Sequence, residues 1–192
     1  MILFNGPNTP FGRMARVTAL ELGITVDNRV ITVASADWLD AMNPLRQIPT
    51  LLLGDGAAVF DSRVICTYFA TLAQAPDLVP SEIRIQTRWA LVLGLMEAGV
   101  SRQMERVRPA GEQSPTVIAR AEQRIASAIA RLEAEAEEIC DGFGRIDRIA
   151  TAAALDYTDF RYPNDWRRTA PRLGSWLAAV LDRPSMATTQ PR

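Results

Sequence analysis

The chain has 192 residues, of which 48% are hydrophobic and 22% are charged, a composition typical of a globular protein with a sizeable core. Its formal net charge is −1 at pH 7, which provides no field that would recruit nucleic acid or an anionic membrane surface. No apolar run approaches the roughly 20 residues of a membrane span. The opening MILFNG lacks the basic and long apolar segments of a signal peptide. We therefore expect neither nucleic acid nor a membrane as a partner.

The reactive residue types exclude several kinds of catalytic site. The chain has no histidine, which removes Ser-His-Asp and Cys-His catalysis and argues against zinc. Its two cysteines, Cys66 and Cys140, are far apart, so neither a disulfide scaffold nor a dithiol redox site is expected. No calcium-loop spacing is present either, and we predict no metal site. This cysteine usage fits a reducing, cytoplasmic location.

The first eighty residues alternate between strand and helix patterns. A short apolar strand, MILF, precedes a helix over 10–22, where apolar residues recur at helical spacing and Gly23 supplies the stop. Residues 28–35 are predicted to form a β-branched strand, and residues 37–44 a helical turn or loop. Two strands over 50–53 and 57–60, joined by a Gly-Asp-Gly turn, are followed by a helix over 63–74. This order predicts a parallel β-α-β unit with an antiparallel hairpin at its edge.

Two prolines stand where elements begin. Pro10 suits the first position of its helix because its missing N–H would be unpaired there anyway, and the Thr9 hydroxyl can cap that helix. A helix N-terminus after a strand is a natural place to hold an anion, including a thiolate. Pro49 begins the third strand, and from this position alone a trans and a cis Ile48–Pro49 peptide bond are about equally expected. A cis bond would expose the backbone of Ile48 to a peptide-like ligand.

From residue 81 onward the patterns are helical. Helices are predicted over 81–107, 115–139, 148–161 and 170–183, the second of them capped by Ser114 with Pro115 at its first position. The closing MATTQPR has little to pack, and we expect a disordered tail. The composition changes at Pro76–Pro80, which predicts an α/β domain over 1–75, a linker over 76–80 and an all-α domain over 81–192.

Three stretches together resemble the cytosolic glutathione S-transferase family. MILFNGPNTPFGRMARVTALELGI is similar to the family's opening strand, Ser/Thr/Cys-Pro-Phe-x-Arg turn and helix ending in Glu-x-Gly-Ile. NPLRQIPTLLLGDGAAVFDSRVICTYF resembles its Asn-Pro-x-x-x-(Val/Ile)-Pro-x-Leu and (Glu/Asp)-Ser-x-x-Ile stretches, and AALDYTDFR its core helix. The small bacterial members with Ser or Thr in the first turn are the most similar. The resemblance implies a thioredoxin-like N-terminal domain, a helical C-terminal domain, a cis Ile48–Pro49 bond, glutathione as co-substrate without another cofactor, and a homodimer.

The resemblance also implies which residues bind the glutathione sulfur and its cysteinyl part. Thr9 takes the place of a Ser or Cys that faces the sulfur, and its hydroxyl would stabilise the thiolate and lower the thiol pKa from ~8.5 toward neutrality. Asn8 is the second choice for this donor, and a Thr9 that only caps the helix is the alternative. Ile48, before cis Pro49, would bind the cysteinyl part through its backbone.

The two ends of glutathione are assigned in the same way. Gln47 could reach the glycine carboxylate where many relatives carry a cation, and Arg46 could compensate for that lost charge. The Ser62 hydroxyl and N–H fit the α-carboxylate of the γ-glutamyl group at a helix N-terminus. Asp61 can pair with the α-ammonium of the same group. A plain double cap of the following helix is the alternative for this pair.

A second-substrate pocket is expected between the two domains. Phe11 would face it, and Arg102 and Arg106, four residues apart on one helical face, would bring positive charge to its rim; a solvated face is the alternative. Arg13 is either a structural member of the first helix or a solvated charge. The core helix begins with RIDRIA instead of the family's Ser/Thr-x-x-Asp, so we expect a less stable start there.

These observations predict a glutathione transferase that favours the thiolate and lets it attack a small hydrophobic electrophile or a peroxide. A non-catalytic glutathione-binding or protein-interaction module with the same fold is the alternative, because Thr replaces the more usual Ser, Tyr or Cys. A thiol reductase would need a cysteine in the first turn, and that turn contains none.

Overall fold

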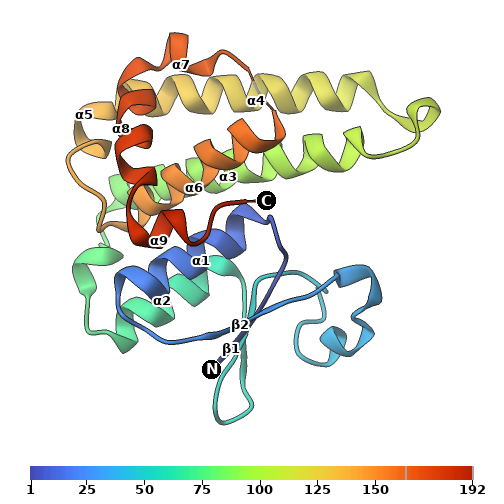
Figure 1. Ribbon diagram of the computed structural model, residues 1–192, viewed down its shortest axis with the longest axis vertical. Helices are drawn as coiled ribbons and strands as arrows, with labels where there is room; N and C mark the ends of the chain where they lie inside the picture. Colours follow the sequence, from blue (N-terminus) through green and yellow to red (C-terminus); the bar gives the residue numbers. More distant parts are fainter. Residues whose placement is uncertain (163, 192) are drawn as a thin grey trace.

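The structure, a computed structural model, describes residues 1–162 and 164–191. Figure 1 shows an α/β layer beside a layer of helices. The first layer contains, in chain order, β1 (Ile2–Asn5), α1 (Pro10–Glu21), β2 (Asp27–Val30), 3-10 helices at Val33–Ser35 and Asp37–Ala41, β3 (Thr50–Leu52), β4 (Ala58–Val59) and α2 (Ser62–Leu72). After 3-10 helix Pro76–Leu78 come α3 (Ile83–Arg106), 3-10 helix Ala110–Glu112, α4 (Pro115–Ala134), α5 (Ala136–Ile139), α6 (Ile146–Arg161), α7 (Trp166–Thr169), α8 (Pro171–Leu181) and α9 (Pro184–Ala187).

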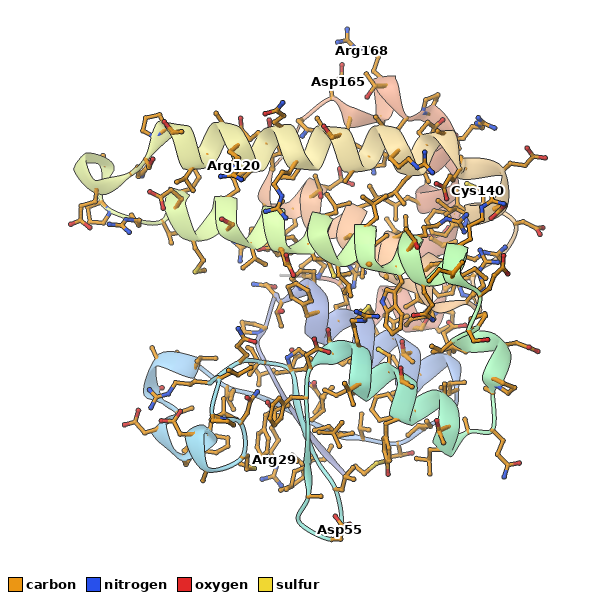
Figure 2. The ribbon with its side chains drawn as sticks, turned by 180° about the vertical axis from the view of Figure 1, so that it is seen from behind. Arg29, Asp55, Arg120, Cys140, Asp165 and Arg168 are labelled. Atoms are coloured by element: carbon orange, nitrogen blue, oxygen red, sulfur yellow. The ribbon has the colours of Figure 1, made fainter. Side chains whose placement is uncertain are left out.

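Four short strands form a mixed sheet in the order β2-β1-β3-β4. β1 and β2 run parallel because α1 carries the chain back between them. β3 is antiparallel to β1 and β4 is antiparallel to β3. Gly56 adopts a φ of 89° in the turn of this hairpin, and Figure 2 shows Asp55 at its tip. The sheet with its helices, followed by the helical layer, confirms the predicted fold class: a thioredoxin-like α/β unit and then an all-α unit.

The second strand is shorter than its β-branched pattern predicts. It ends at Val30, whereas the pattern extended over 28–35. The Ile31 N–H donates to the Asn5 carbonyl, 2.8 Å away, and Asn5 is the last residue of β1. The neighbouring strand therefore offers no further partner, and the chain turns into the two 3-10 helices.

Helices α1 and α2 lie between the sheet and the helical layer (Figure 1). The side chains of Val17 and Phe69 in these helices are fully buried, as are Leu3 and Leu51 on the strands. Complete burial of one such side chain stabilises the fold by roughly 1.5–3 kcal/mol. This shared core fixes where α1 and α2 begin, and both beginnings contribute to the candidate site.

The helical layer is built on α3, α4 and α6. Four alanines of α6 between residues 150 and 154 are at most 1% exposed, and their small side chains let neighbouring helices approach closely. Ser114 caps α4 as predicted, its Oγ accepting the Val117 N–H at 3.4 Å. The helix predicted over 115–139 is interrupted at Glu135, and α7 was not expected from the sequence. Within the described chain, none of the helices combines the length and apolar character needed to cross a membrane.

Among the described residues, the start of α6 lacks a capping hydrogen bond from its N-cap side chain, in line with the missing Ser/Thr-x-x-Asp pattern, but ion pairs hold it in place. Arg145 is the N-cap residue, and in the described part of the chain its side chain makes no capping hydrogen bond. The second residue of the helix, Asp147, is fully buried and accepts hydrogen bonds from Arg88 at 2.8 Å and from Arg145 at 2.7 Å. Arg88 comes from α3, so the charges join two helices where the capping box is missing.

The prediction of a disordered tail is wrong for the residues that the structure describes. Residues Pro184–Ala187 form α9, Met186 is fully buried and Thr189 is 4% exposed. The buried guanidinium of Arg13 on α1 donates to the Met186 carbonyl at 3.2 Å and to the Thr189 hydroxyl at 3.3 Å. These hydrogen bonds from Arg13 hold the tail in place, which the composition of the tail does not indicate. The domain boundaries at 76–80 stay a prediction.

Candidate active site

Predicted site residues from separate segments line one cleft of about 980 Å³ between the two layers. From the α/β layer it contains Asn8, Thr9, Phe11, Arg46, Gln47, Ile48, Pro49, Asp61 and Ser62. The long helix α3 and the end of α6 form the opposite wall, including Leu93, Val100, Met104, Tyr157 and Arg161. A volume of this size lies in the range of small-molecule sites, which are commonly found at the junction of two structural units.

The first turn is held by the side chain of Asn5, which is 2% exposed and accepts the Gly6 N–H at 2.9 Å. A Cβ atom on Gly12 would come within 1.6 Å of the Asn5 Oδ1, so α1 needs glycine there for the turn to close. Thr9 is the N-cap residue, but within the described residues its side chain makes no capping hydrogen bond. The expected hydroxyl cap is therefore wrong. Pro10 occupies the first helical position as predicted, and the Thr9 hydroxyl is not committed to α1.

The Ile48–Pro49 peptide bond is cis, as the resemblance implied. The loop before it is tied by Asn43, whose Nδ2 donates to the Gln47 carbonyl and to the Thr50 Oγ1, both at 3.0 Å. The Thr50 hydroxyl also donates to the Gln47 carbonyl at 2.8 Å. These bonds use the Gln47 backbone and leave its side chain exposed at the cleft.

Arg46 lines the cleft, but its charge is balanced within its own loop. Its guanidinium donates to the Asp40 carboxylate and lies 3.0 Å from the Asp37 carboxylate. The hydrogen bond from Arg46 lowers the pKa of Asp40 below its ordinary value. A glycine carboxylate of glutathione would have to compete with these two acids for Arg46.

Asp61 and Ser62 stand together at the start of α2. The Asp61 Oδ1 accepts the N–H groups of Arg63 at 2.9 Å and Val64 at 3.4 Å, so Asp61 caps the helix. Ser62 is 5% exposed at the first helical position and also lines the cleft. The capping interpretation holds for Asp61, and the placement of both residues at the cleft is compatible with the binding interpretation as well.

On the second-substrate side, Phe11 lines the cleft, whereas Arg102 and Arg106 are not among its lining residues in the described chain. Arg102 Nε donates to the Glu122 Oε1 at 2.7 Å, and its guanidinium stacks on the ring of Tyr162 with 3.8 Å to the centroid. The neighbouring helix α4 thus supplies a carboxylate that holds Arg102 away from the expected rim. Arg106, the last residue of α3, is exposed.

Sequence reasoning expected the long helix α3 in this wall but missed the contribution of α6, which supplies Tyr157 and Arg161. They lie four residues apart on one face of α6, a spacing that would have indicated a shared surface. Tyr157 is 6% exposed; burial raises the pKa of its phenol, although the adjacent Arg161 guanidinium acts in the opposite direction. A Cβ on Gly99 of α3 would lie 3.2 Å from the Tyr157 ring, so this glycine makes room for the tyrosine.

The two thiols are poorly suited to nucleophilic chemistry. Cys66 is fully buried in α2, and this burial raises its pKa to about 12. Burial also raises the pKa of Cys140, which Figure 2 shows at one end of the helical layer. In the part of the chain that the structure describes, no group of three or more His, Cys, Asp or Glu residues is arranged to hold a metal ion.

Comparison with known proteins assigns the family. Residues 9–72 match the family described as "Glutathione S-transferase, N-terminal domain". The chain is 30% identical over 202 residues to the uncharacterized GST-like protein YibF of Escherichia coli K12, covering 100% of this chain and 98% of YibF. This protein belongs to the glutathione S-transferase family.

Three of the similar solved structures match along the whole chain. A glutathione S-transferase from Methylobacillus flagellatus KT with glutathione bound has a TM-score of 0.91 and 30% identity, covering 100% of this chain and 99% of that one. A glutathione transferase family member from Pseudomonas fluorescens Pf-5 with glutathione bound has a TM-score of 0.91 and 32% identity, with coverage of 100% and 98%. A structure from the same organism and target, with a TM-score of 0.88, 32% identity and coverage of 100% and 97%, carries S-(propanoic acid)-glutathione.

Proposed function

We propose that this protein is a glutathione transferase. The main support is that Thr9, the cis Ile48–Pro49 bond and the Asp61–Ser62 pair all line one cleft. These segments lie far apart in the sequence, and each suits a different part of one extended tripeptide. The glutathione bound in two relatives of 30% and 32% identity supports the same ligand for this chain.

In the proposed complex, the Ile48 backbone pairs with the cysteinyl part of glutathione as an added strand would. The Ser62 hydroxyl and N–H bind the α-carboxylate of the γ-glutamyl group, and Asp61 pairs with its ammonium. The sulfur then lies at the N-terminus of α1, where Thr9 donates a hydrogen bond to it. Gln47, at the exposed edge of the cleft, takes the glycine end.

The chemical work of the chain is to favour the thiolate and to position it. The Thr9 hydroxyl and the partial positive charge at the α1 N-terminus lower the pKa of the bound thiol from ~8.5 toward neutrality. The thiolate attacks an electrophilic carbon held beside Phe11, a carbon–sulfur bond forms, and the leaving group departs with its electron pair. With a peroxide, the sulfur attacks an oxygen instead, the O–O bond breaks, and a second glutathione completes the disulfide.

The wider assignments form part of this proposal. We place the glutathione-binding domain at 1–75 and the helical domain at 81–192, joined by 76–80. The protein acts in the cytoplasm as a homodimer on glutathione and a small hydrophobic electrophile. The Pseudomonas fluorescens relative bound to S-(propanoic acid)-glutathione supports a cleft that accepts a glutathione conjugate.

A non-catalytic glutathione-binding module is the second candidate. Thr9 favours it because a β-branched alcohol is a less usual sulfur ligand than Ser, Tyr or Cys in this family. The third candidate, a thiol reductase, is disfavoured because the Cys66 thiol is buried and its pKa is raised to about 12. A thiol in that state supplies almost no thiolate at neutral pH.

Calorimetry with glutathione, together with turnover of chlorodinitrobenzene, tests the proposal. We expect the wild-type protein to bind glutathione and to form the conjugate. Thr9→Ala should lower kcat/KM by about tenfold or more, because a hydrogen bond to a charged group is lost, while glutathione affinity is largely kept. Thr9→Ser is the matched control and should retain turnover. Binding without turnover would favour the non-catalytic module, and absence of glutathione binding would exclude both.

A further inference from the structure

We propose that the second substrate of this protein carries a carboxylate or similar anionic group, and that Arg161 binds it. This inference rests on the proposed transferase function and names a substrate class for the second half of the cleft. Arg161 is the last residue of α6 and lines the cleft opposite the first turn. Its role would be to select and orient the electrophile, while Thr9 acts on the sulfur.

Arg161 and Arg63 are the cations of the cleft that have no carboxylate partner among the described residues, and Arg161 is the less exposed of the two. Arg46 is paired with two aspartates, and the exposed Arg63 stacks on the ring of Trp89 with 5.3 Å to the centroid. Arg161 makes no ion pair with any residue in 1–162 or 164–191, and its Nε is buried without a hydrogen-bond partner there. A buried donor of a charged group without an acceptor is costly. An anionic ligand in the cleft would neutralise the charge of the guanidinium.

The end of α6 is built to hold the Arg161 guanidinium in place. Arg102, the residue expected at the rim, donates to the Arg161 carbonyl at 3.3 Å and thereby fixes the last turn of α6. The Arg161 guanidinium stacks over the Phe160 ring with 4.2 Å to the centroid. It also lies beside Tyr157, whose packing depends on Gly99. A cation restrained on several sides loses little entropy when it binds a carboxylate.

The other residues of this wall indicate what the remainder of the second substrate is like. Phe11, Leu93, Val100 and Met104 present apolar surface to the cleft. The acidic side chain on this wall, Glu97, is exposed and lies 3.9 Å from Arg124 on α4. The apolar residues of this wall, next to Arg161, suit a compact apolar or aromatic electrophile that ends in an acid. A neutral electrophile of the same size would leave the Arg161 charge without a counter-ion.

A matched pair of aryl chlorides tests this preference. Chloronitrobenzoate carries the carboxylate, and chloronitrobenzamide is a neutral analogue of similar shape. In each reaction the glutathione thiolate forms a bond to the ring carbon bearing chlorine, the carbon–chlorine bond breaks, and chloride leaves with the electron pair. The acid or amide group is unchanged, so each rate is compared with the uncatalysed rate of the same compound.

We expect Arg161→Gln to lower kcat/KM for the acid by about tenfold or more and to change the amide rate less than about twofold. Arg161→Lys should recover part of the loss. Arg120→Gln is the control for removing an exposed arginine; Figure 2 shows Arg120 on α4, which α3 separates from the α/β layer. It should leave both rates unchanged. Equal losses for acid and amide in Arg161→Gln, or no loss for either, would overturn the inference.

Calorimetry with the two finished conjugates separates this inference from the proposed function. If the protein binds glutathione but conjugates neither chloride, the transferase proposal fails. The inference then stands only if the acid conjugate binds at least about tenfold tighter than the amide conjugate and Arg161→Gln abolishes that difference. Equal affinity for both conjugates overturns the inference whether or not turnover is seen. Unchanged glutathione affinity in Arg161→Gln verifies that the variant is folded.

Discussion

Arg13 on α1 forms an ion pair with Asp156 on α6, and this pair joins the α/β layer to the helical layer. Only 6% of the Arg13 side chain and 15% of the Asp156 side chain are exposed. The same guanidinium holds the backbone of the tail at Met186. Arg13 is therefore a structural member of α1 and not a solvated charge. It fixes α1, whose N-terminus is the proposed thiolate site, against the helical layer.

We predict that Arg13→Met lowers the free energy of unfolding by about 3–5 kcal/mol, because it leaves the Asp156 carboxylate buried without its cation. Urea denaturation measures this loss. Arg29→Met is the control, since the pair between Arg29 and Asp27 is 55% and 54% exposed and such pairs contribute at most about 1 kcal/mol. A double variant, Arg13→Met with Asp156→Leu, should lose less than the sum of the single losses. Strict additivity would contradict the pairing.

The packed tail leads to a second prediction. Met186→Ala should lower the free energy of unfolding by about 2–5 kcal/mol, since Met186 is fully buried and its removal leaves a cavity beside α1. Met104→Ala is the control for stability, because Met104 is 58% exposed and its truncation should change stability by less than about 0.5 kcal/mol. Similar unfolding midpoints for the two variants would mean that the tail does not pack as described.

The order of strands and helices was predictable because each signal is local. The apolar spacing of 10–22, the Gly-Asp-Gly turn and Ser114 before Pro115 all produced the expected elements. The errors occur where a distant residue decides the outcome. Nothing in MATTQPR indicates that a buried arginine more than 170 positions earlier will bind its backbone. The early end of β2 likewise depends on where β1 stops.

The candidate site was predictable on the glutathione side and less so on the electrophile side. Thr9, Pro49 and Ser62 belong to short motifs whose local geometry nearly defines their place, and all three line the cleft. The second pocket lies where helices from different parts of the chain meet. Helical spacing on α3 could not reveal that α4 presents Glu122 to Arg102, or that α6 ends with Arg161 facing the cleft.

A cluster of charges at the start of α6 predicts acid sensitivity. We call Arg88 with Glu135, Glu138 and Asp147 the Arg88 cluster; its three ion-pair distances are 2.7, 2.6 and 2.8 Å. Burial opposes ionisation of Asp147, but hydrogen bonds from Arg145 and Arg88 outweigh it and place its pKa below the ordinary value. The hydrogen bond from Arg88 also lowers the pKa of Glu138.

Because these carboxyl pKa values are lower in the folded chain than in the unfolded chain, the unfolded chain binds more protons in the acid range. The stabilisation is complete above the unfolded pKa values of about 4 and is lost as the pH falls through the folded values. We predict that the urea concentration at the unfolding midpoint of the wild type decreases when the pH is lowered below about 5. Asp147→Asn should be less stable at neutral pH, and its deficit should shrink on acidification. A deficit that is constant with pH would argue against the cluster as the source.

The last prediction separates the two roles of Asp61, helix cap and partner of the glutamyl ammonium. Asparagine caps helices about as well as aspartate, so Asp61→Asn should change the free energy of unfolding by less than about 0.5 kcal/mol, whereas Asp61→Ala should cost about 1 kcal/mol. Only the carboxylate can pair with an ammonium, so both variants should weaken glutathione binding by about tenfold in calorimetry. If Asp61→Asn keeps full affinity, Asp61 is a cap alone, and the γ-glutamyl group must be held by Ser62 and the α2 N-terminus without it.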